Sequence, residues 1–348
     1  MSKPAVERPV DQPEQTIAGT LRRNGRHIMT NWIRELALLP VIVLLVVIGA
    51  FVNPAFLTAS NFINVAQESA ALGAVVAAET LILLTGKFDL SLQATYGLAP
   101  MLGAWLIVSP DGQGLGSDWN PFLGIAIVLL VGVVVGAFNG FMVIKLGFNA
   151  FIFTLAMLIL LTGIQVGIVS GRTIYHLPAE FIYLGSQYLL GVPVSVWVTG
   201  AIFLLSALFL RYHRVGRAIY AIGGNTEAAR AAGIHVDRVR IGVFIVASLL
   251  AALAGLMTAG EVDAVTASQG NNLIFSVFAA AVIGGISLDG GRGRMVGALT
   301  GVILLALVQN ILILSPLTQG QTFWIDAASG LIILIALALA RLIGTERT

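Results

Sequence analysis

The chain contains no cysteine in its 348 residues, which excludes disulfides, thiolate metal ligands and thiol catalysis. Charged residues are also scarce, at 10% of the chain against about 25% in an ordinary soluble domain. The sequence has no Gly-x-x-x-x-Gly-Lys-Ser/Thr phosphate loop, so it cannot hydrolyse ATP through that motif. The histidines are scattered and predict no metal site: His27, His176, His213 and His235. No nucleophile, base and orienting residue can be assembled from the sequence either.

Long uncharged segments take up most of the chain. A helix needs about 20 mostly apolar residues to cross roughly 30 Å of hydrocarbon. Eight uncharged runs qualify, at 36–67, 90–110, 121–144, 146–171, 181–210, 241–260, 264–288 and 295–325. Two further spans are marked by one acid each, with Glu79 inside 69–85 and Asp326 just before 327–340. We therefore predict an all-α polytopic membrane protein with about ten transmembrane helices.

The distribution of basic residues predicts the orientation. When the chain is threaded ten times from an N-terminus inside, every one of its 19 Lys and Arg residues except Arg172 falls on the inner side. The outer loops carry acids instead: Glu68, Asp111, Asp118, Glu180, Glu261 and Asp263. Both termini are therefore expected in the cytoplasm, with an N-terminal tail over 1–35, a transmembrane domain over 36–343 and a short end at 344–348.

The longest charged stretch outside the tail, 211–240, lies on the predicted inner side between the sixth and seventh spans. Asn225 or Thr226 can cap a helix there, Glu227 suits its first turn, and Gly233 can end it. A short amphipathic helix along the membrane surface is expected. Its arginines either dock a cytoplasmic protein or form a solvated basic loop, and both readings remain open from spacing alone.

Several short motifs follow one another in a recognisable order. Within 211–240 they are Gly216, Arg217, Ala218, Ile219, Tyr220, Ala221, Ile222, Gly223, Gly224, Asn225, Glu227, Ala228, Ala229, Arg230, Gly233 and Ile234. Elsewhere they are Asn53, Pro54, Phe56, Leu57, Thr58 and Asn61, then Leu84, Thr85, Gly86, Asp89, Leu90 and Ser91, then Gly140, Phe151, Ile152, Thr154 and Leu155, and finally Gly284, Gly285, Gly290, Gly291, Arg292 and Gly293. This order, over about 36–341, resembles the permeases of ribose-type bacterial ABC importers, within the branched-chain amino acid and sugar permease superfamily.

The resemblance implies a set of partners and a location. Two permease subunits, identical or paired with a similar one, would form the pathway in the bacterial inner membrane. A cytoplasmic ATPase would use ATP and Mg, a periplasmic binding protein would deliver a sugar, and this chain would bind no cofactor. The residues implied in ATPase coupling are Gly216, Arg217, Gly223, Gly224, Asn225, Glu227, Ala228, Ala229, Arg230 and Gly233.

Three polar residues around the second and third spans are candidates for the substrate pathway. Glu79 lies mid-span, where a carboxylate is costly, so it should face a partner or a wet cavity. It can accept hydrogen bonds from a sugar or act as a gate, it can be a neutral packing residue, or it can couple protons. Asp89 with Ser91 sits where the second span turns into the third, at the inner end or in a re-entrant bend. There the carboxylate caps the third helix or contacts substrate.

Amides and glycines complete the candidates. The amides within or beside apolar spans suit sugar hydroxyls and interhelical hydrogen bonds equally well: Asn139, Gln165, Asn271, Asn272, Gln309 and Asn310. Gly132, Gly136 and Gly140 form a small-xxx-small register that predicts close helix packing. The glycines around Arg292 and Arg294 predict a tight turn near lipid or the ATPase, or alternatively a phosphate nest.

Three classes of function follow. The first is the permease of a monosaccharide importer, for a pentose, hexose or related polyol. The second is a related importer permease for a branched-chain amino acid, nucleoside, autoinducer or other small polar solute. The third is an ion-coupled secondary transporter or a membrane-embedded enzyme. It is disfavoured because only Glu79 is clearly an intramembrane charge.

Overall fold

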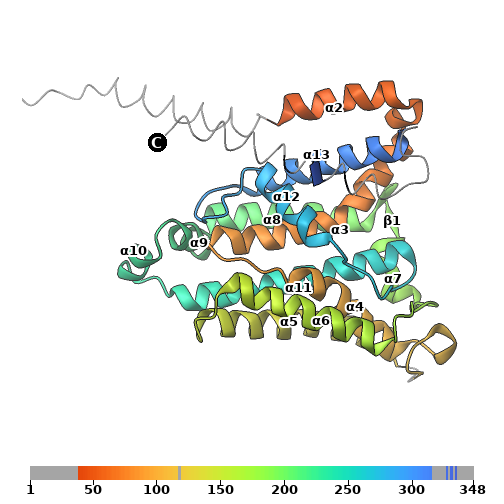
Figure 1. Ribbon diagram of the computed structural model, residues 1–348. Coiled ribbons are helices and arrows are strands. Elements are labelled where there is room, and N and C mark those ends of the chain that lie inside the picture. The colour runs from red at the N-terminus through yellow and green to blue at the C-terminus, as the bar shows by residue number, and fades with distance from the viewer. Residues whose placement is uncertain (1–37, 117–118, 316–326, 328–329, 332–333, 335–348) are drawn as a thin grey trace, which may run out of the picture.

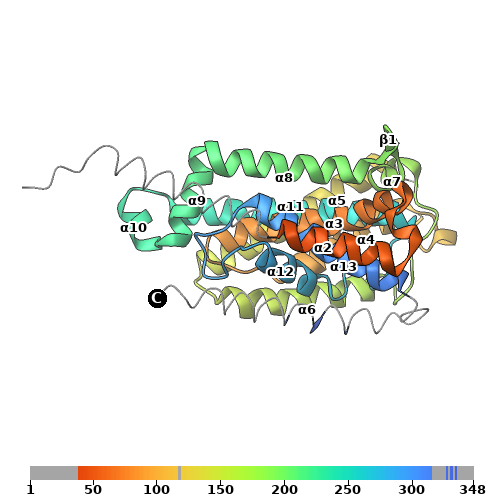
Figure 2. The ribbon, with the colours of Figure 1, turned by 90° about the horizontal axis from the view of Figure 1, so that it is seen from above.

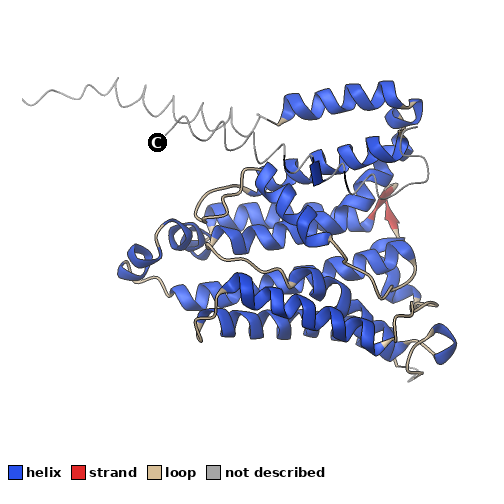
Figure 3. Ribbon diagram, in the orientation of Figure 1, coloured by secondary structure: helices blue, strands red, loops and turns tan. Residues whose placement is uncertain are grey.

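The structure, a computed structural model, describes residues 38–116, 119–315, 327, 330, 331 and 334. Its secondary structure is almost wholly helical (Figure 3). Strands β1 (Tyr188–Leu189) and β2 (Val192–Pro193) form one antiparallel hairpin. The predicted tail at 1–35, the end at 344–348 and most of the tenth span at 327–340 lie outside the described residues.

Twelve helices and two short 3₁₀ turns make up the described fold. In chain order they are α2 (Leu39–Val52), η1 (Pro54–Leu57), α3 (Ala59–Leu84), α4 (Leu92–Ile107), η2 (Pro110–Gly112), α5 (Pro121–Ile144), α6 (Ala150–Ile168), α7 (Ala179–Ser186), α8 (Val194–Tyr212), α9 (Arg214–Gly224), α10 (Thr226–Ala231), α11 (Val236–Val262), α12 (Leu273–Ile283) and α13 (Met295–Leu314).

Side-chain caps begin several of these helices. The side-chain oxygens of Thr58, Asn120, Asn149 and Asn225 each accept a backbone N–H in the first turn of the helix that follows. Such a cap satisfies one of the four N–H groups that a helix leaves free at its N-terminus. The short polar residues that punctuate the apolar runs therefore mark where α3, α5, α6 and α10 start.

The two ends of the helical bundle differ in chemistry. One end, here called the basic end, carries α9 and α10; the opposite end, the hairpin end, carries α7 and the β hairpin (Figure 1). Every described Lys and Arg except Arg172 belongs to the basic end. Seen from above, α8 lies along one side of the bundle and α6 along the other (Figure 2).

Several predicted spans are interrupted. The run 36–67 is not one span, because Asn53 and Pro54 end α2 and start η1, and α3 begins afresh at Ala59. Glu68, expected in an outer loop, therefore lies inside α3. The run 181–210 contains α7, the hairpin and α8, since a tight turn at Leu190 and Gly191, both with positive φ, separates the strands.

Two predicted spans are broken helices. The third predicted span, 90–110, contains α4, and residues 85–91 before it turn back into the protein without helical structure. In place of the eighth span, residues 263–272 are non-helical, and α12 has 11 residues, about 16 Å at 1.5 Å per residue. The N-termini of these two helices meet, because the Gln93 Oε1 accepts the N–H of Ile274 at 3.1 Å.

Long helices match part of the predicted set of spans. Six described helices are long and apolar enough to cross a membrane, namely α3, α5, α6, α8, α11 and α13, and α2 and α12 are shorter apolar helices. The predicted run 121–144 coincides with α5, and 146–171 contains α6. An all-helical polytopic fold is thus confirmed, while the total of about ten stays a prediction.

The broken helices belong to two similar sets of three. α3, α4 and α5 form one set, and α11, α12 and α13 form the other, with α3 and α11 side by side and antiparallel (Figure 1). α3 packs against α12 and α13, and α11 packs correspondingly against α4 and α5. This arrangement is an inverted repeat of structure, the organisation in which membrane transporters build sites at the ends of discontinuous helices.

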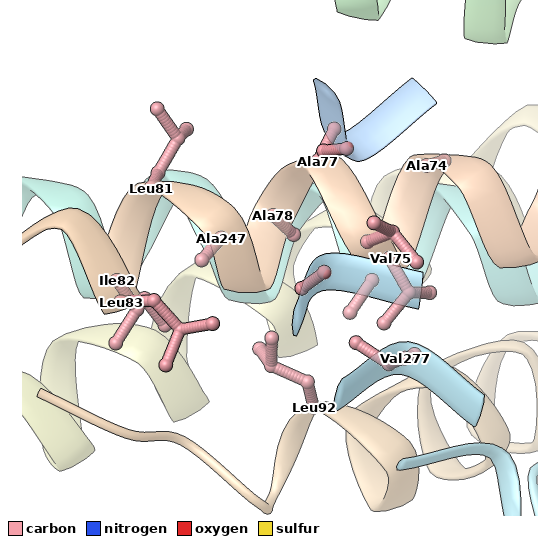
Figure 4. Packing of buried hydrophobic residues seen from close by; sticks show 14 of the residues in the cluster. Ala74, Val75, Ala77, Ala78, Leu81, Ile82, Leu83, Leu92, Ala247 and Val277 are labelled. Atoms are coloured by element: carbon pink, nitrogen blue, oxygen red, sulfur yellow. The ribbon is translucent and has the colours of Figure 1, made fainter. Parts of the chain in front are cut away.

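Small side chains bring α3 and α11 together. Ala74, Ala77 and Ala78 of α3, Ala247 of α11 and Val277 of α12 are fully buried in one cluster, and Ala78 lies near Ala247 (Figure 4). The glycine register of α5 serves the same purpose, as predicted. A methyl group at Gly136 would approach the Phe244 carbonyl oxygen of α11 to 2.5 Å. Close backbone contact is the main means of packing where lipid removes the hydrophobic drive between helices.

Candidate functional site

The predicted coupling loop contains two helices. The expected helix after Asn225 is α10, whose Ala228 N–H is capped by the Asn225 side chain at 2.9 Å and which Gly233, with φ of 82°, follows. α9, ahead of it, was not predicted. Its Gly216, Ile219 and Ile222 are buried at helical spacing, a pattern that could have revealed it.

The loop presents a polar face to the surroundings. Arg217, Glu227, Ala228 and Arg230 are exposed, whereas Ala229 is buried in a small apolar cluster with Ile222 and Val236. Two of the exposed arginines also bond within the chain. Arg217 Nη1 donates to the Tyr212 carbonyl at 2.8 Å, and Arg230 lies 3.4 Å from Asp237.

Ion pairs and hydrogen bonds tie the loop to the bundle. Asp237, at the start of α11, bonds Lys145 Nζ at 2.9 Å, which links α10 and α11 to the end of α5. Arg240 Nη2 donates to the Thr226 hydroxyl at 3.0 Å and to the Thr85 carbonyl at 2.9 Å. Arg240 therefore joins α10 to the end of α3, a role that sequence analysis missed.

The structure brings four predicted pathway residues into one buried cluster. Asp89 Oδ1 accepts the Ser91 N–H at 2.9 Å and the Ser91 hydroxyl at 2.5 Å. Asn139 Nδ2, from α5, donates to Ser91 Oγ at 2.6 Å and to Asp89 Oδ2 at 3.4 Å. Glu79 Oε1, from α3, accepts the Asp89 N–H at 3.4 Å. All four residues are fully buried.

This cluster decides between the two placements of Asp89. Glu79 lies five residues before the end of α3, about 7.5 Å along the helix axis, and Asp89 reaches back to it. The segment 85–91 is therefore a re-entrant bend. Thr154 of α6 supports the bend by accepting the Leu90 N–H on its hydroxyl at 3.1 Å.

The cluster contains no basic partner among the described residues. Each described ion pair uses other residues, and all of them lie at the two ends of the bundle. Glu79 Oε2 and Asn139 Oδ1 also find no hydrogen-bond partner in the described part of the chain. The arrangement can hold the start of α4 in place through backbone N–H groups, which is the use that the described hydrogen bonds show.

The remaining amides do not join this cluster. Gln165 Nε2 of α6 donates to the carbonyls of Ala267 and Gln269 at 3.2 and 3.1 Å, which fixes the non-helical segment 263–272. Gln269 in turn donates to the carbonyls of Tyr96 and Gly255 at 3.3 and 2.9 Å. Gln93 and Gln269 were missed, although both are polar residues in uncharged runs.

The other predicted amides are divided between bonded and exposed positions. Asn310 of α13 exchanges hydrogen bonds with Asn61 of α3 at 2.9 and 3.0 Å. Asn271 and Asn272 are exposed just before α12, and Gln309 is partly exposed on α13. Asn271 and Asn272 thus lie closest to the meeting point of the two broken helices.

The glycine-rich turn at 284–294 is a structural turn. Its Gly291 N–H donates to the Leu84 carbonyl at 3.0 Å, and its Ser287 N–H donates to the Arg292 carbonyl at 2.9 Å. Since these N–H groups already have acceptors within the protein, they do not form an open nest for phosphate. The tight-turn interpretation is the one the structure supports.

Known proteins resemble the chain over most of its length. The family described as "Branched-chain amino acid transport system / permease component" matches residues 61–337. The ribose import permease protein RbsC of Escherichia coli is 32% identical over 85% of this chain and 89% of its own. RbsC of Bacillus subtilis is 34% identical over 86% and 90% of the two chains. The autoinducer 2 import system permease protein LsrC of Yersinia pseudotuberculosis is 31% identical over 86% and 82%.

No solved structure matches the chain. The family match covers well over half of its residues, and the relatives exceed 30% identity over more than four fifths of it. A permease subunit of this kind binds no cofactor of its own, as predicted, and depends on an ATPase and a binding protein. The chain therefore belongs to the ribose and branched-chain amino acid family of ABC importer permeases, as a multi-pass inner-membrane transport subunit and not an enzyme.

Proposed function

We propose that the chain imports a monosaccharide, a pentose, hexose or related polyol, as the permease of an ATP-driven importer. The observation that carries this proposal is the match to ribose import permeases at 32 to 34% identity, over at least 85% of both chains. The match to an autoinducer 2 permease at 31% makes another small polar solute the competing candidate.

The basic end faces the cytoplasm in this proposal. Lys and Arg concentrate in the cytoplasmic loops of membrane proteins, and all described basic residues except Arg172 belong to the basic end. The ATPase then docks on the exposed face of α9 and α10, through Arg217, Glu227, Ala228 and Arg230. The binding protein approaches the hairpin end.

The pathway is formed between two permease subunits. Two grooves of the described part, of about 430 and 500 Å³, are lined mostly by apolar side chains, which suit lipid or another helix better than a sugar. Hydroxyl-binding groups lie instead where α4 and α12 begin, at Gln93, Asn271 and Asn272. An identical or similar second subunit would close this region into a path.

The buried residues of the candidate list support that region. Glu79, Asp89, Ser91 and Asn139 hold the start of α4, and Gln165 holds the segment before α12. In this proposal they position the pathway without touching solute, whereas Asn271 and Asn272 contact it. Gln309 and Asn310 lie in the last two turns of α13, where Asn310 exchanges hydrogen bonds with Asn61 of α3.

Transport by reconstituted membranes tests the proposal. Vesicles containing this chain, its ATPase and its binding protein should take up a labelled pentose, hexose or polyol only with ATP. Glu227→Lys should abolish uptake and co-purification of the ATPase, because it reverses the charge on the exposed face of α10.

Glu180→Lys is the matched control, since Glu180 is an exposed acid on α7 at the hairpin end, and it should leave ATPase docking intact. Uptake driven by a proton or sodium gradient without ATP would contradict the importer. ATP-dependent uptake of a non-sugar solute alone would support the importer function but contradict the proposed sugar substrate.

A further inference from the structure

The end of α9 touches the chain at two places that lead to the broken helices. Gly223 lies so close to the end of α3 and to the glycine-rich turn that a methyl group there would overlap the Leu84 carbonyl oxygen and the Gly291 nitrogen. The turn and the end of α3 also touch each other. A methyl group at Gly290 would come within 2.7 Å of Gly86 Cα and 3.2 Å of Gly223 Cα.

These four glycines, Gly86, Gly223, Gly290 and Gly291, are here called the glycine joint. Three of them have positive φ, at 73° for Gly86, 91° for Gly290 and 68° for Gly291, a conformation that L side chains rarely adopt. The joint therefore uses glycine for two separate reasons: backbone geometry in the two turns and close approach in α9.

Hydrogen bonds surround the glycine joint and tie together the three segments that meet there. Gly291 N–H donates to the Leu84 carbonyl at 3.0 Å, and the Tyr220 hydroxyl of α9 donates to the Gly293 carbonyl at 3.0 Å. Arg240 adds a third link between α10 and the Thr85 carbonyl. No side chain stands between these backbones at Gly223, so a displacement of α9 is transmitted without a compressible layer.

Each partner of α9 in the joint leads directly to one broken helix. From Gly86 the re-entrant bend runs to Leu92, the first residue of α4, and its Asp89 and Leu90 are anchored to Glu79 and Thr154. On the other side, Gly290 and Gly291 belong to the turn that follows α12. That turn is closed by the hydrogen bond that the Ser287 N–H donates to the Arg292 carbonyl.

We propose that the glycine joint is the positioning element through which movement of the docking loop reaches both broken helices, α4 and α12, at once. This inference rests on the proposed importer function and deepens it. ATPase closure displaces α9 and α10, the joint carries the displacement to the start of the bend and to the end of α12, and the facing N-termini of the two half-helices shift together. Gly223 and Arg240 are positioning residues, since neither touches solute.

Two glycines inside helices provide a matched test. Gly223→Ala inserts a methyl group into the joint, whereas a methyl group at Gly242 of α11 meets nothing within 4 Å. Gly223 lies in the last turn of α9 and Gly242 lies inside α11, and alanine favours the helix at both positions. In the reconstituted full importer, Gly223→Ala should keep the ATPase bound and hydrolysing ATP but lower solute uptake per ATP by at least about tenfold. Gly242→Ala should behave as the natural protein does.

Two milder variants cover the case in which Gly223→Ala does not assemble. Tyr220→Phe loses only the hydroxyl that reaches Gly293, and should lower uptake per ATP by about fivefold, the worth of one hydrogen bond. Arg240→Met keeps the length of the side chain without its donors and should uncouple more strongly than Tyr220→Phe. Wild-type uptake per ATP in both variants would overturn the proposal.

Amide hydrogen exchange tests the joint without the ATPase. In the full chain in lipid nanodiscs, Gly223→Ala should speed exchange in both 85–91 and 284–294, and Gly242→Ala should not. If the natural importer shows no ATP-dependent uptake, the proposed function is contradicted. The exchange measurement does not depend on transport, so it still tests the glycine joint. Unchanged exchange in both segments would overturn the joint, whatever the transported solute.

Discussion

Asp89 and Glu79 are both fully buried carboxylates, but they accept different numbers of hydrogen bonds. Asp89 accepts hydrogen bonds from the Ser91 backbone, the Ser91 hydroxyl and Asn139. Glu79 accepts one long bond from the Asp89 N–H, and its second oxygen has no partner in the described part of the chain. The two side chains are therefore expected to respond differently to replacement by the amide of the same shape.

Asp89→Asn should destabilise the protein by about 2 to 3 kcal/mol, because the amide nitrogen faces donors where the carboxylate accepted them. Glu79→Gln should cost less than about 1 kcal/mol, since its oxygen still accepts the Asp89 N–H. Thermal unfolding of the purified chain in one detergent compares the two. Equal losses would show that the two carboxylates act as one unit instead.

Helix packing in the bundle depends on where glycines face. Gly136 of α5 lies against α11, where a methyl group would come within 2.5 Å of the Phe244 carbonyl oxygen and 2.7 Å of Ile245 Cα. Gly163 of α6 has open space around it. Both are inside helices, so the intrinsic helix preference of the two positions is the same.

Gly136→Ala is therefore expected to lower stability by about 1 to 3 kcal/mol through overpacking. Gly163→Ala should leave it unchanged or raise it by up to about 1 kcal/mol, because alanine is the better helix former. Unfolding midpoints of the two variants, measured side by side, test these two expected changes in stability. A loss of stability in Gly163→Ala would indicate a second subunit packed on that face of α6.

The elements that sequence predicted best are those whose signals are local. α5 fills an uncharged run, and α10 follows an Asn225 cap with an acid in its first turn. The breaks before α4 and α12 have no local signal of that kind. Hydropathy reports the free energy of transferring side chains from water into lipid, and it does not report whether the backbone is helical. Gln165 satisfies the backbone of the second break from a residue about 100 positions away.

The candidate site shows the same limit. Glu79, Asp89, Ser91 and Asn139 were each singled out as polar residues in apolar surroundings, and the structure brings them together. Their grouping was not predictable, since it depends on the re-entrant bend and on α5, about 50 residues further along the chain. No local signal separates Arg240 from the other basic residues of 211–240, because its acceptors are a distant carbonyl and a hydroxyl.

At the scale of the whole molecule, the proposed functional elements of the inverted repeat lie at three levels along the bundle. The docking loop and the glycine joint lie at the basic end, the facing starts of α4 and α12 lie within the bundle, and α7 with the hairpin lies at the far end (Figure 1). In the proposed importer, solute and ATPase meet the protein at opposite ends, and the broken helices are the elements between them. This division requires that the two ends face different compartments.

The absence of cysteine allows that orientation to be measured directly. Leu189→Cys on the hairpin and Ala228→Cys on α10 introduce single thiols at exposed positions of opposite ends. In intact spheroplasts a membrane-impermeant maleimide should label Leu189→Cys at once, and Ala228→Cys only after the membrane is permeabilised. The concentration of basic residues beside α10 is the physical reason, since positive loops stay on the cytoplasmic side. Labelling of Ala228→Cys in intact spheroplasts would reverse the orientation, and the proposed ATPase would then have no access to its docking helix.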